Sequence, residues 1–364
     1  MSSTTTTRIA RLRARMAETG TDLTVLGPTS HMRWLAGLDP HGDERPVLLC
    51  VSQIYAGLLM PSLNADSVRQ DTDLPFHCWK DDEGPAAALD DLLGKCGPIG
   101  SLSIDETMRA DFALAVIDRF PGIKRTFADQ TVGWLRAEKD EEEYRRLKAS
   151  ALVNDKVFRI AFDSLREGMT ELDLAQIMTQ AYKAEGAAPE FLIVGFGANG
   201  AFPHHHTGHT ALQRDMSVLI DCGARFGGYP SDMTRMVWFG QPTDEFLKVG
   251  AIVEGAVQAA VAAARPGVPA RDVDAAARGV ITAAGYGPRF LHRTGHGVGI
   301  DIHEGPYITA TSNLPLRRGN VFSIEPGIYL EGHFGLRLEE VVYLRDTGAE
   351  VLSELPRTIV VRAA

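Results

Sequence analysis

Apolar runs and amphipathic segments alternate along the first third of the chain. Four short runs rich in Val, Leu and Ile predict buried strands, at residues 21–27, 45–52, 55–61 and 101–106. Two segments with apolar positions at helical spacing predict helices, at residues 86–97 and 111–120. We therefore expect residues 1–134 to form an α/β domain, a mixed or parallel sheet flanked by helices, after a frayed tail of six or seven residues.

The pattern changes at residues 136–168, which are highly charged and free of proline. Acid-to-base pairs such as Glu141 and Arg145 lie four positions apart, where side chains meet on one helix face. We expect one long helix here. It would open a second domain, residues 135–364.

A weak internal repeat predicts a duplicated helix-and-strand unit in this second domain. Residues 166–186 and 265–285 share an Arg-x-Gly start, a helical pattern and a closing Gly, at an offset of 99 positions. After each copy, an apolar run ends in an acid and a second acid follows: Asp221 and Asp232 in the first half, Glu325 and Glu339 in the second. Each half is thus expected to contribute two carboxylates.

The first pair of acids flanks a predicted hairpin. Gly227 and Gly228 can adopt the positive φ that a tight turn needs. If the chain folds about Phe226 and Gly227, Asp221 and Asp232 become cross-strand partners with Cβ atoms about 5 Å apart. Two buried carboxylates that close repel each other unless one is protonated or a cation lies between them.

Histidines gather in the same domain, since eight of the eleven lie between residues 204 and 333. His292, His296 and His303 lie in a glycine-rich segment that is unsuited to a helix, so this is not a helical zinc motif, and it lacks the context of a phosphate-binding loop. The run 204–206 follows a turn-rich loop suited to a site wall. The cluster predicts a site rather than isolated structural histidines.

Four carboxylates and one imidazole are mostly oxygen ligands, which suit a pair of divalent ions such as Mn²⁺, with Co²⁺ or Zn²⁺ able to compete. Two such ions share a bridging hydroxide and polarise a carbonyl, which is hydrolytic chemistry. The period of a strand places Arg337 on the face of Glu339. Arg337 would either neutralise Glu339 or hold a substrate carboxylate.

Composition excludes other classes of function. A formal charge of −10 argues against nucleic-acid binding, and we find neither an apolar span of about 20 residues nor a signal peptide. The four cysteines, Cys50, Cys78, Cys96 and Cys222, show no metal or disulfide spacing and predict reduced, packed thiols in a cytoplasmic protein. In the first domain, His31, His41 and His77 are scattered and carry little evidence of chemistry.

Four motifs now match a known family: GANGAFPHH (197–205), DCGARFGGYPSDMTR (221–235), HRTGHGVGIDIHEGPYI (292–308) and EPGIYLEGHFGLRLEE (325–340). They resemble the pita-bread metallopeptidases, specifically the Xaa-Pro branch of prolidases and aminopeptidase P. The first domain resembles the creatinase-like domain that precedes the catalytic domain there. The resemblance implies an α+β pita-bread domain with an internal pseudo-twofold repeat.

The resemblance also implies a role for each matching residue. The metal ligands fall on Asp221, Asp232, His296, Glu325 and Glu339, with Asp232 and Glu339 bridging the two metals. Glu325 would accept the proton of the attacking water, and His303 would steady the oxyanion. His204 would contact the scissile peptide or the proline carboxylate. His292 and Arg337 would line the proline side of the pocket. Tyr229, a candidate for substrate binding, and Thr234 would lie behind the ligands, whereas His205 and His206 stay outside the site.

The expected substrate is a small peptide with proline at the second position, because the X–Pro bond lacks the N–H that most peptidases bind. Arg337 and the histidines favour an Xaa-Pro dipeptide over a longer peptide, which leaves an Xaa-Pro aminopeptidase as the alternative. A hydrolase of small N-acyl amino acids on the same site is a further one. Methionine aminopeptidase would lack the first domain, and a creatinase or a non-enzymatic binding module would lack the ligands. The resemblance implies a homodimer.

Overall fold

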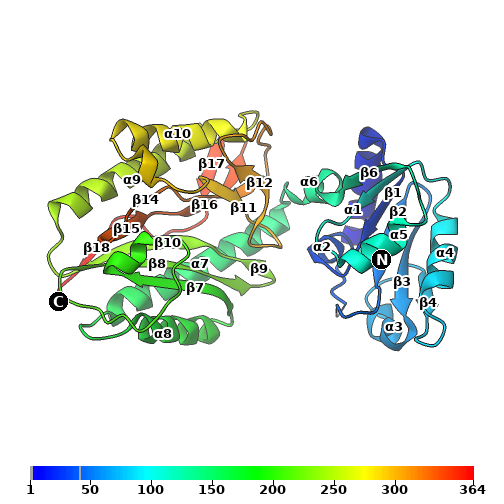
Figure 1. Cartoon of the computed structure of the whole chain (residues 1–364), viewed down its shortest axis with the longest axis horizontal. Helices are drawn as coiled ribbons and strands as arrows, with labels where there is room; N and C mark the ends of the chain where they lie inside the picture. The colour runs from blue at the N-terminus through cyan, green and yellow to red at the C-terminus, as the bar shows by residue number, and fades with distance from the viewer. Residues whose placement is uncertain (1–2, 41) are drawn as a thin grey trace. The chain divides into compact units, whose positions relative to one another are not determined.

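The computed structural model describes residues 3–40 and 42–364. It divides the chain into two compact units, Met1–Arg136 and Ala137–Ala364 (Figure 1). From the sequence we placed this boundary between residues 134 and 135.

The first unit is built on a six-stranded sheet with the order β4-β3-β2-β1-β5-β6. Its strands are β1 (Leu23–Leu26), β2 (Leu48–Ser52), β3 (Ala56–Pro61), β4 (Phe76–Trp79), β5 (Ser101–Ile104) and β6 (Lys124–Phe127). β1 runs antiparallel to β2 and parallel to β5, so the sheet is mixed, which is one of the two arrangements that we expected.

Within the described part of this unit, six α-helices accompany the sheet: α1 (Ser3–Thr19), α2 (Ser30–Ala36), α3 (Ser62–Arg69), α4 (Ala86–Lys95), α5 (Ala110–Ile117) and α6 (Val132–Arg136). α4 and α5 bury Leu92 and Val116 against Leu23, Leu48 and Leu102 of the sheet. This apolar layer makes the first unit an α/β domain.

The expected frayed tail is wrong for the described residues, because α1 already begins at Ser3. Thr5 is buried, and its hydroxyl donates to the carbonyl of Ala36 at 3.3 Å. Ile9, Leu12 and Met16 continue a buried face at helical spacing. Packing of this face orders a segment whose run of threonines had suggested disorder.

The histidines of this unit have local partners. His31 is buried, accepts from Arg136 at 3.1 Å through Nδ1 and lies 3.2 Å from Glu106 through Nε2. His77 lies between Tyr55, at 2.8 Å, and Asp91, at 2.7 Å. His41 lies outside the described residues.

The second unit opens with the long helix α7 (Glu141–Ser164). It is shorter than the expected span of 136–168, because Asp140 caps its start in a capping box with Glu143. Before the cap, Arg136 ends helix α6, and Glu138 forms a bridge with Asn320.

The strands of this unit form two larger sheets and a hairpin. The first sheet, in the order β18-β10-β8-β7, contains β7 (Ala188–Phe196), β8 (Met216–Phe226), β10 (Met233–Phe239) and β18 (Val360–Arg362), with β9 (Tyr229–Pro230) paired to β8. The second, in the order β12-β11-β13-β16-β17, contains β11 (Gly295–Gly297), β12 (Glu304–Ile308), β13 (Val321–Ile324), β16 (Glu340–Arg345) and β17 (Gly348–Val351). The hairpin pairs β14 (Gly327–Leu330) with β15 (Phe334–Arg337).

The predicted repeat corresponds to a pair of helices. α8 (Glu171–Ala184) and α10 (Ala270–Ala283) each have 14 residues, and they begin 99 positions apart. Each packs beside a longer helix, α8 against α7 and α10 against α9 (Asp244–Ala263). The strands lie between the two helix pairs (Figure 1), which makes this unit the α+β pita-bread domain.

Helix α9 departs from one expectation, because its length and composition would allow it to cross a membrane. Core helices pass the same test. Phe246, Val249, Val253 and Val257 of α9 are fully buried in the core of the second unit.

The four cysteines form no disulfide within the part of the chain that the structure describes. Cys50, Cys96 and Cys222 are buried, as expected of packed thiols, but Cys78 is exposed, so the expectation of packing is wrong for Cys78.

Candidate metal centre

The hairpin of β8 and β10 positions the first two acids. Its turn falls at residues 227–228, where the glycines have φ of 59° and 87°. That is one residue further along than expected, so Asp221 lies opposite Thr234 rather than opposite Asp232. The predicted direct pairing of the two acids is therefore wrong. Asp232 lies two residues before Thr234 and is a diagonal neighbour of Asp221.

The second sheet and the loops around it position the other three residues. His296 lies in strand β11, as its glycine neighbours suggested, and not in a helix. Glu325 directly follows the buried strand β13, and Glu339 lies between β15 and β16. Each acid thus ends or interrupts a strand in the interior of the second unit.

These five side chains converge. In three overlapping groups, all candidate ligand atoms lie within 4.8 Å of one another: His296 with Glu325 and Glu339, Asp221 with Asp232 and Glu339, and Asp232 with His296 and His303. His296 Nε2 is 3.5 Å from Asp232 and 3.4 Å from Glu325. The arrangement brings together all five residues that the sequence proposed as ligands.

The cluster is electrostatically unfavourable without a cation. Burial raises the pKa of Asp232 and Glu339 well above the usual range of a carboxyl, and the charges of neighbouring acids add to the rise. Burial raises the pKa of Glu325 to about 7, although Arg337 opposes the rise. Asp221 Oδ1 is buried and has no hydrogen-bond partner among the described residues. Bound cations would relieve both the repulsion and the unpartnered oxygen.

His296 supplies a nitrogen donor in the form a metal needs. Burial and the nearby His303 lower the pKa of His296 to about 3, so its imidazole is neutral. Its Nδ1 donates to the carbonyl of Gly297 at 3.1 Å, which leaves the lone pair of Nε2 available to a metal ion between His296 and the carboxylates. Four carboxylates with a neutral imidazole fit divalent ions such as Mn²⁺, Co²⁺ or Zn²⁺.

Thr234 and Arg337 lie behind these ligands. The Thr234 hydroxyl donates to Glu339 at 2.8 Å and accepts from Arg337 Nε at 3.0 Å. Arg337 Nη2 lies 2.6 Å from Asp221 Oδ2. Within the described residues Arg337 therefore pairs with Asp221, not with Glu339 as one of our two sequence hypotheses had it.

A cavity of about 580 Å³ opens onto the cluster. Besides the five proposed ligands it is lined by His204, His292, His303 and Arg337, all of which the sequence placed at the site. The ring of His303 lies 3.8 Å, centroid to centroid, from that of His296. One wall therefore carries negative charge, while Arg337 contributes positive charge to the same cavity.

One candidate, Tyr229, lies elsewhere, and two histidines that we left out of the site stay out of it. Tyr229 is buried and does not line the cavity, and its hydroxyl donates to Glu143 at 3.0 Å. We therefore place Tyr229 behind the site rather than against the substrate. His205 contacts Glu171 at 2.9 Å, and neither His205 nor His206 is among the lining residues.

Sequence reasoning missed Tyr329. Its hydroxyl accepts from Arg337 Nη1 at 2.7 Å and donates to His292 Nε2 at 2.7 Å. Burial, together with the charge of Arg337, lowers the pKa of His292 to about 4. A signal was available, because Tyr329 lies in the motif 325–340, between the candidates Glu325 and Arg337. Six residues that line the cavity were not among the candidates either: Glu190, Phe191, Ile193, Pro203, Arg293 and Ile302.

Comparison with known proteins identifies relatives of both units. The model of metallopeptidase family M24 matches residues 145–346, and that of the creatinase/prolidase N-terminal domain matches residues 8–137. The probable dipeptidase PepE of Mycobacterium tuberculosis is 34% identical over 97% of this chain and 96% of its own length.

Two solved structures extend this likeness to the fold. The prolidase from Thermococcus sibiricus has a TM-score of 0.89 and 36% identity, covering 97% of this chain and 98% of its own. An X-Pro aminopeptidase from Thermotoga maritima has a TM-score of 0.83 and 31% identity, covering 97% of this chain and 99% of its own.

Proposed function

Because the chain belongs to metallopeptidase family M24, we propose that this enzyme hydrolyses the Xaa-Pro bond of dipeptides with two divalent metal ions. The observation that carries this proposal is a single cavity that combines four clustered carboxylates and His296 with a buried arginine, Arg337. The carboxylates suit metal ions, and the arginine suits the free carboxylate of a dipeptide.

Asp221, Asp232, His296, Glu325 and Glu339 would hold the ions, with Asp232 and Glu339 shared between them. We expect Mn²⁺, with Co²⁺ or Zn²⁺ able to substitute. When bound, such a pair of ions polarises the scissile carbonyl and lowers the pKa of a water molecule.

The proton acceptor in this proposal is Glu325. In the metal-free protein, burial raises the pKa of Glu325 to about 7, so this carboxylate holds a proton more readily than an exposed one. The Ser323 hydroxyl donates to Glu325 Oε1 at 3.1 Å, and the same oxygen of Ser323 accepts from the backbone N–H of His296 at 3.0 Å. This bridge fixes the base relative to the neighbouring ligand. His303, beside His296, would donate to the oxygen on which negative charge develops.

The substrate end of the cavity is assigned to His204, His292 and Arg337. Three of the five N–H groups of Arg337 are directed to Thr234, Tyr329 and Asp221, which fixes the plane of the guanidinium. A carboxylate recognised by such a fixed fork is held in one orientation. His292, kept neutral by burial, and His204 would contact the proline ring side and the scissile peptide.

We also expect a homodimer in the cytoplasm that binds neither nucleic acid nor membranes. The support is the resemblance for the dimer, the formal charge of −10 and, for the compartment, four cysteines that form no disulfide among the described residues.

The test is hydrolysis of Ala-Pro, Ala-Pro-Ala and N-acetylalanine by chelator-treated, dialysed protein before and after addition of Mn²⁺. Mn²⁺-dependent cleavage of Ala-Pro alone would support the dipeptidase. Cleavage of the tripeptide would instead make the enzyme an Xaa-Pro aminopeptidase. If Mn²⁺ binds and only N-acetylalanine is cleaved, the metal chemistry stands and the proline specificity is wrong.

A further inference from the structure

A second buried arginine, Arg235, follows Thr234 on strand β10. Side chains of consecutive strand residues project to opposite faces, and Arg235 is not among the residues that line the cavity of the metal centre. Its side chain is 1% exposed. A buried guanidinium is costly unless hydrogen bonds and an opposite charge compensate it, so its partners show what it stabilises.

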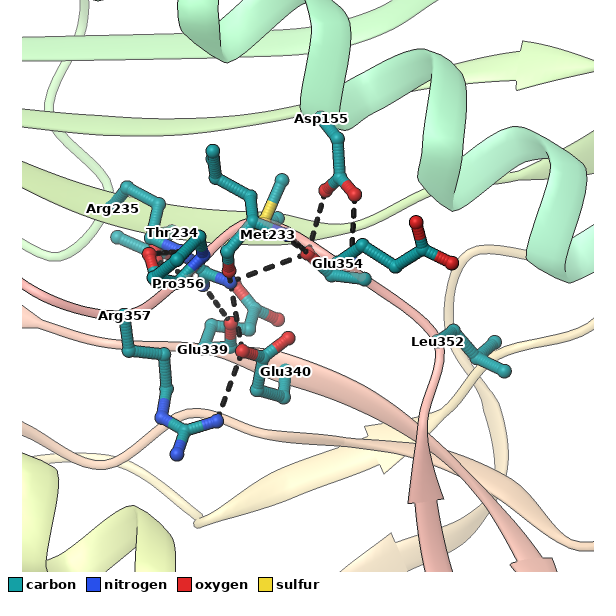
Figure 2. Close-up of polar contacts among 12 residues, drawn as sticks. Asp155, Met233, Thr234, Arg235, Glu339, Glu340, Leu352, Glu354, Pro356 and Arg357 are labelled. Atoms are coloured by element: carbon teal, nitrogen blue, oxygen red, sulfur yellow. Dashed lines mark hydrogen bonds and ion pairs between the residues drawn. The ribbon is translucent and has the colours of Figure 1, made fainter.

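Most partners of Arg235 are backbone carbonyls (Figure 2). Nη1 donates to the carbonyl of Glu339 at 2.5 Å, Nη2 to that of Leu355 at 2.8 Å, and Nε to that of Pro356 at 3.2 Å. The rigid fork of one guanidinium therefore joins the chain at Glu339 to a segment near the C-terminus.

Glu339 is consequently held from both faces of β10. Its backbone N–H donates to the carbonyl of Thr234 at 3.2 Å, and its carboxylate accepts from the Thr234 hydroxyl at 2.8 Å. Its carbonyl accepts from Arg235. Because Glu339 lies between strands β15 and β16, these contacts replace the ladder bonds that fix a residue inside a strand.

An alternating chain of charges keeps Arg235 in place (Figure 2). Arg235 Nη2 lies 2.8 Å from Glu340 Oε1, which also lies 3.1 Å from Arg357 Nη1. Arg357 in turn pairs with Glu254 at 2.8 Å. Glu340 is 2% exposed, and its second oxygen has no hydrogen-bond partner among the described residues.

Net stability alone does not account for this pair. Replacing a buried ion pair by packed apolar side chains is often neutral or stabilising, and the unpartnered oxygen of Glu340 adds a further cost. Apolar side chains could not replace the N–H groups of Arg235, which donate to the carbonyls of Glu339, Leu355 and Pro356.

We propose that Arg235 and Glu340 are positioning residues, which fix the backbone of Glu339 and thereby the carboxylate that reaches the metal ions. This inference rests on the proposed function, because it takes Glu339 as a shared metal ligand. Arg235 touches neither the cavity nor the proposed ligand atoms, so it acts through Glu339. Disturbing it should weaken metal binding without changing which residues bind metal.

The decisive variant is Arg235→Lys, which keeps the positive charge but loses the fork that reaches three carbonyls. We expect the Mn²⁺ dissociation constant of the chelator-treated protein, measured by calorimetry, to rise by about 10- to 100-fold. With saturating Mn²⁺, kcat for Ala-Pro should fall while KM stays near the wild-type value. The visible absorption of bound Co²⁺ should shift, because the geometry around Glu339 changes.

The matched control is Arg357→Met, which removes the outer arginine from Glu340 but none of the contacts to Glu339. This variant should keep the Mn²⁺ affinity and the Co²⁺ spectrum of the wild type. If Arg235→Lys does not fold, Glu340→Gln replaces it. That variant removes the charge that orients Arg235 and should weaken Mn²⁺ binding in the same direction by a smaller factor.

The outcomes separate the two proposals. If wild-type protein binds no Mn²⁺, the proposed function fails. If the wild type binds Mn²⁺ and cleaves Ala-Pro, but the folded Arg235→Lys variant (or Glu340→Gln in its place) keeps the wild-type affinity and Co²⁺ spectrum, the positioning role alone is wrong. Equal weakening by Arg357→Met and Arg235→Lys would also overturn it, because the effect would then be a general loss of charge balance.

Discussion

Two buried charge clusters of the second unit use the adjacent residues Glu339 and Glu340 in opposite ways. The front cluster, which borders the cavity, consists of Asp221, Asp232, His296, Glu325, Arg337 and Glu339. The back cluster consists of Arg235, Glu254, Glu340 and Arg357. In the front cluster four carboxylates face one guanidinium. In the back cluster two carboxylates face two.

This difference in charge balance separates a site from a support. The back cluster is neutralised by its own side chains, so it needs no ligand and can hold the backbone. The front cluster leaves like charges close together in the interior, where repulsion is strong. Its pKa values rise in consequence, and its Asp221 Oδ1 has no partner among the described residues. Protons bound by these acids or an external cation would balance it.

The largest expected effect comes from removing one front carboxylate. Asp232→Asn should abolish Mn²⁺ binding. It should also lower kcat for Ala-Pro by more than about 1000-fold, since the loss of a single hydrogen-bond donor to an oxyanion already lowers kcat by about 10²- to 10³-fold. Stoichiometry of bound Mn²⁺ and turnover of Ala-Pro measure this. Glu339→Gln should behave alike, because both acids are proposed to be shared between the ions.

The same variants test whether the front cluster binds the catalytic metal. If Asp232→Asn keeps full activity after chelation and dialysis, the front cluster does not hold catalytic metal, and its excess charge needs another explanation. The metal-free variant should be no less stable than metal-free wild type, because the substitution removes a repelling charge.

An intermediate effect is expected from pH in the metal-free protein. Between pH 6.5 and 8.5 the free energy of unfolding should fall by at least about 1 kcal/mol in the wild type, and the fall should be about 1 kcal/mol smaller in Glu325→Gln. Urea unfolding at the two pH values measures this. Saturation with Mn²⁺ should remove the dependence, because cations then balance the charge.

The free energy of unfolding is expected to fall with pH because the pKa of Glu325 in the folded protein, about 7, lies above its usual value of 4.5. A carboxyl with a raised pKa contributes stability that is fully present below the unfolded pKa and is lost as the pH rises through the folded one. Asp232 and Glu339 act in the same direction. His296 and His292 have lowered pKa values of about 3 and about 4, so each opposes this fall by about 0.4 kcal/mol as the pH rises from their usual value of 6.5. A stability that rises from pH 6.5 to 8.5 would contradict the repulsion in the front cluster.

Sequence patterns predicted most of the fold, because burial leaves a periodic signal. The apolar runs at 21–27 and 45–52 became β1 and β2, and the 99-residue offset became α8 and α10. Strand β6 was missed, because its residues are largely exposed and polar and show no alternation. The start of α1 was missed for a related reason, since buried threonines such as Thr5 resemble a flexible tail in composition.

The candidate site was predictable where chemistry requires a particular residue type and less so where geometry decides. Carboxylates and histidines after apolar runs marked the front cluster, and the structure brings them together. The pairing of Asp221 with Thr234 depended on the position of one turn. Two consecutive glycines allow the turn to lie at either of two positions one residue apart, so the sequence did not determine the pairing. The back cluster gave no signal, because Arg235 binds carbonyl groups, which every residue carries.

The smallest expected effect comes from Tyr229, which we place outside the front cluster. Tyr229 was a candidate for substrate contact, but its hydroxyl donates to the buried Glu143 at the start of α7. Tyr229→Phe should therefore lower the free energy of unfolding by about 1.5 to 3 kcal/mol, the value of a hydrogen bond to a charged group, and leave KM for Ala-Pro unchanged. Urea unfolding and steady-state kinetics measure the two quantities on the same preparation. If KM instead rises several-fold while stability is unchanged, Tyr229 reaches the substrate and the front cluster extends across the β8–β9 turn.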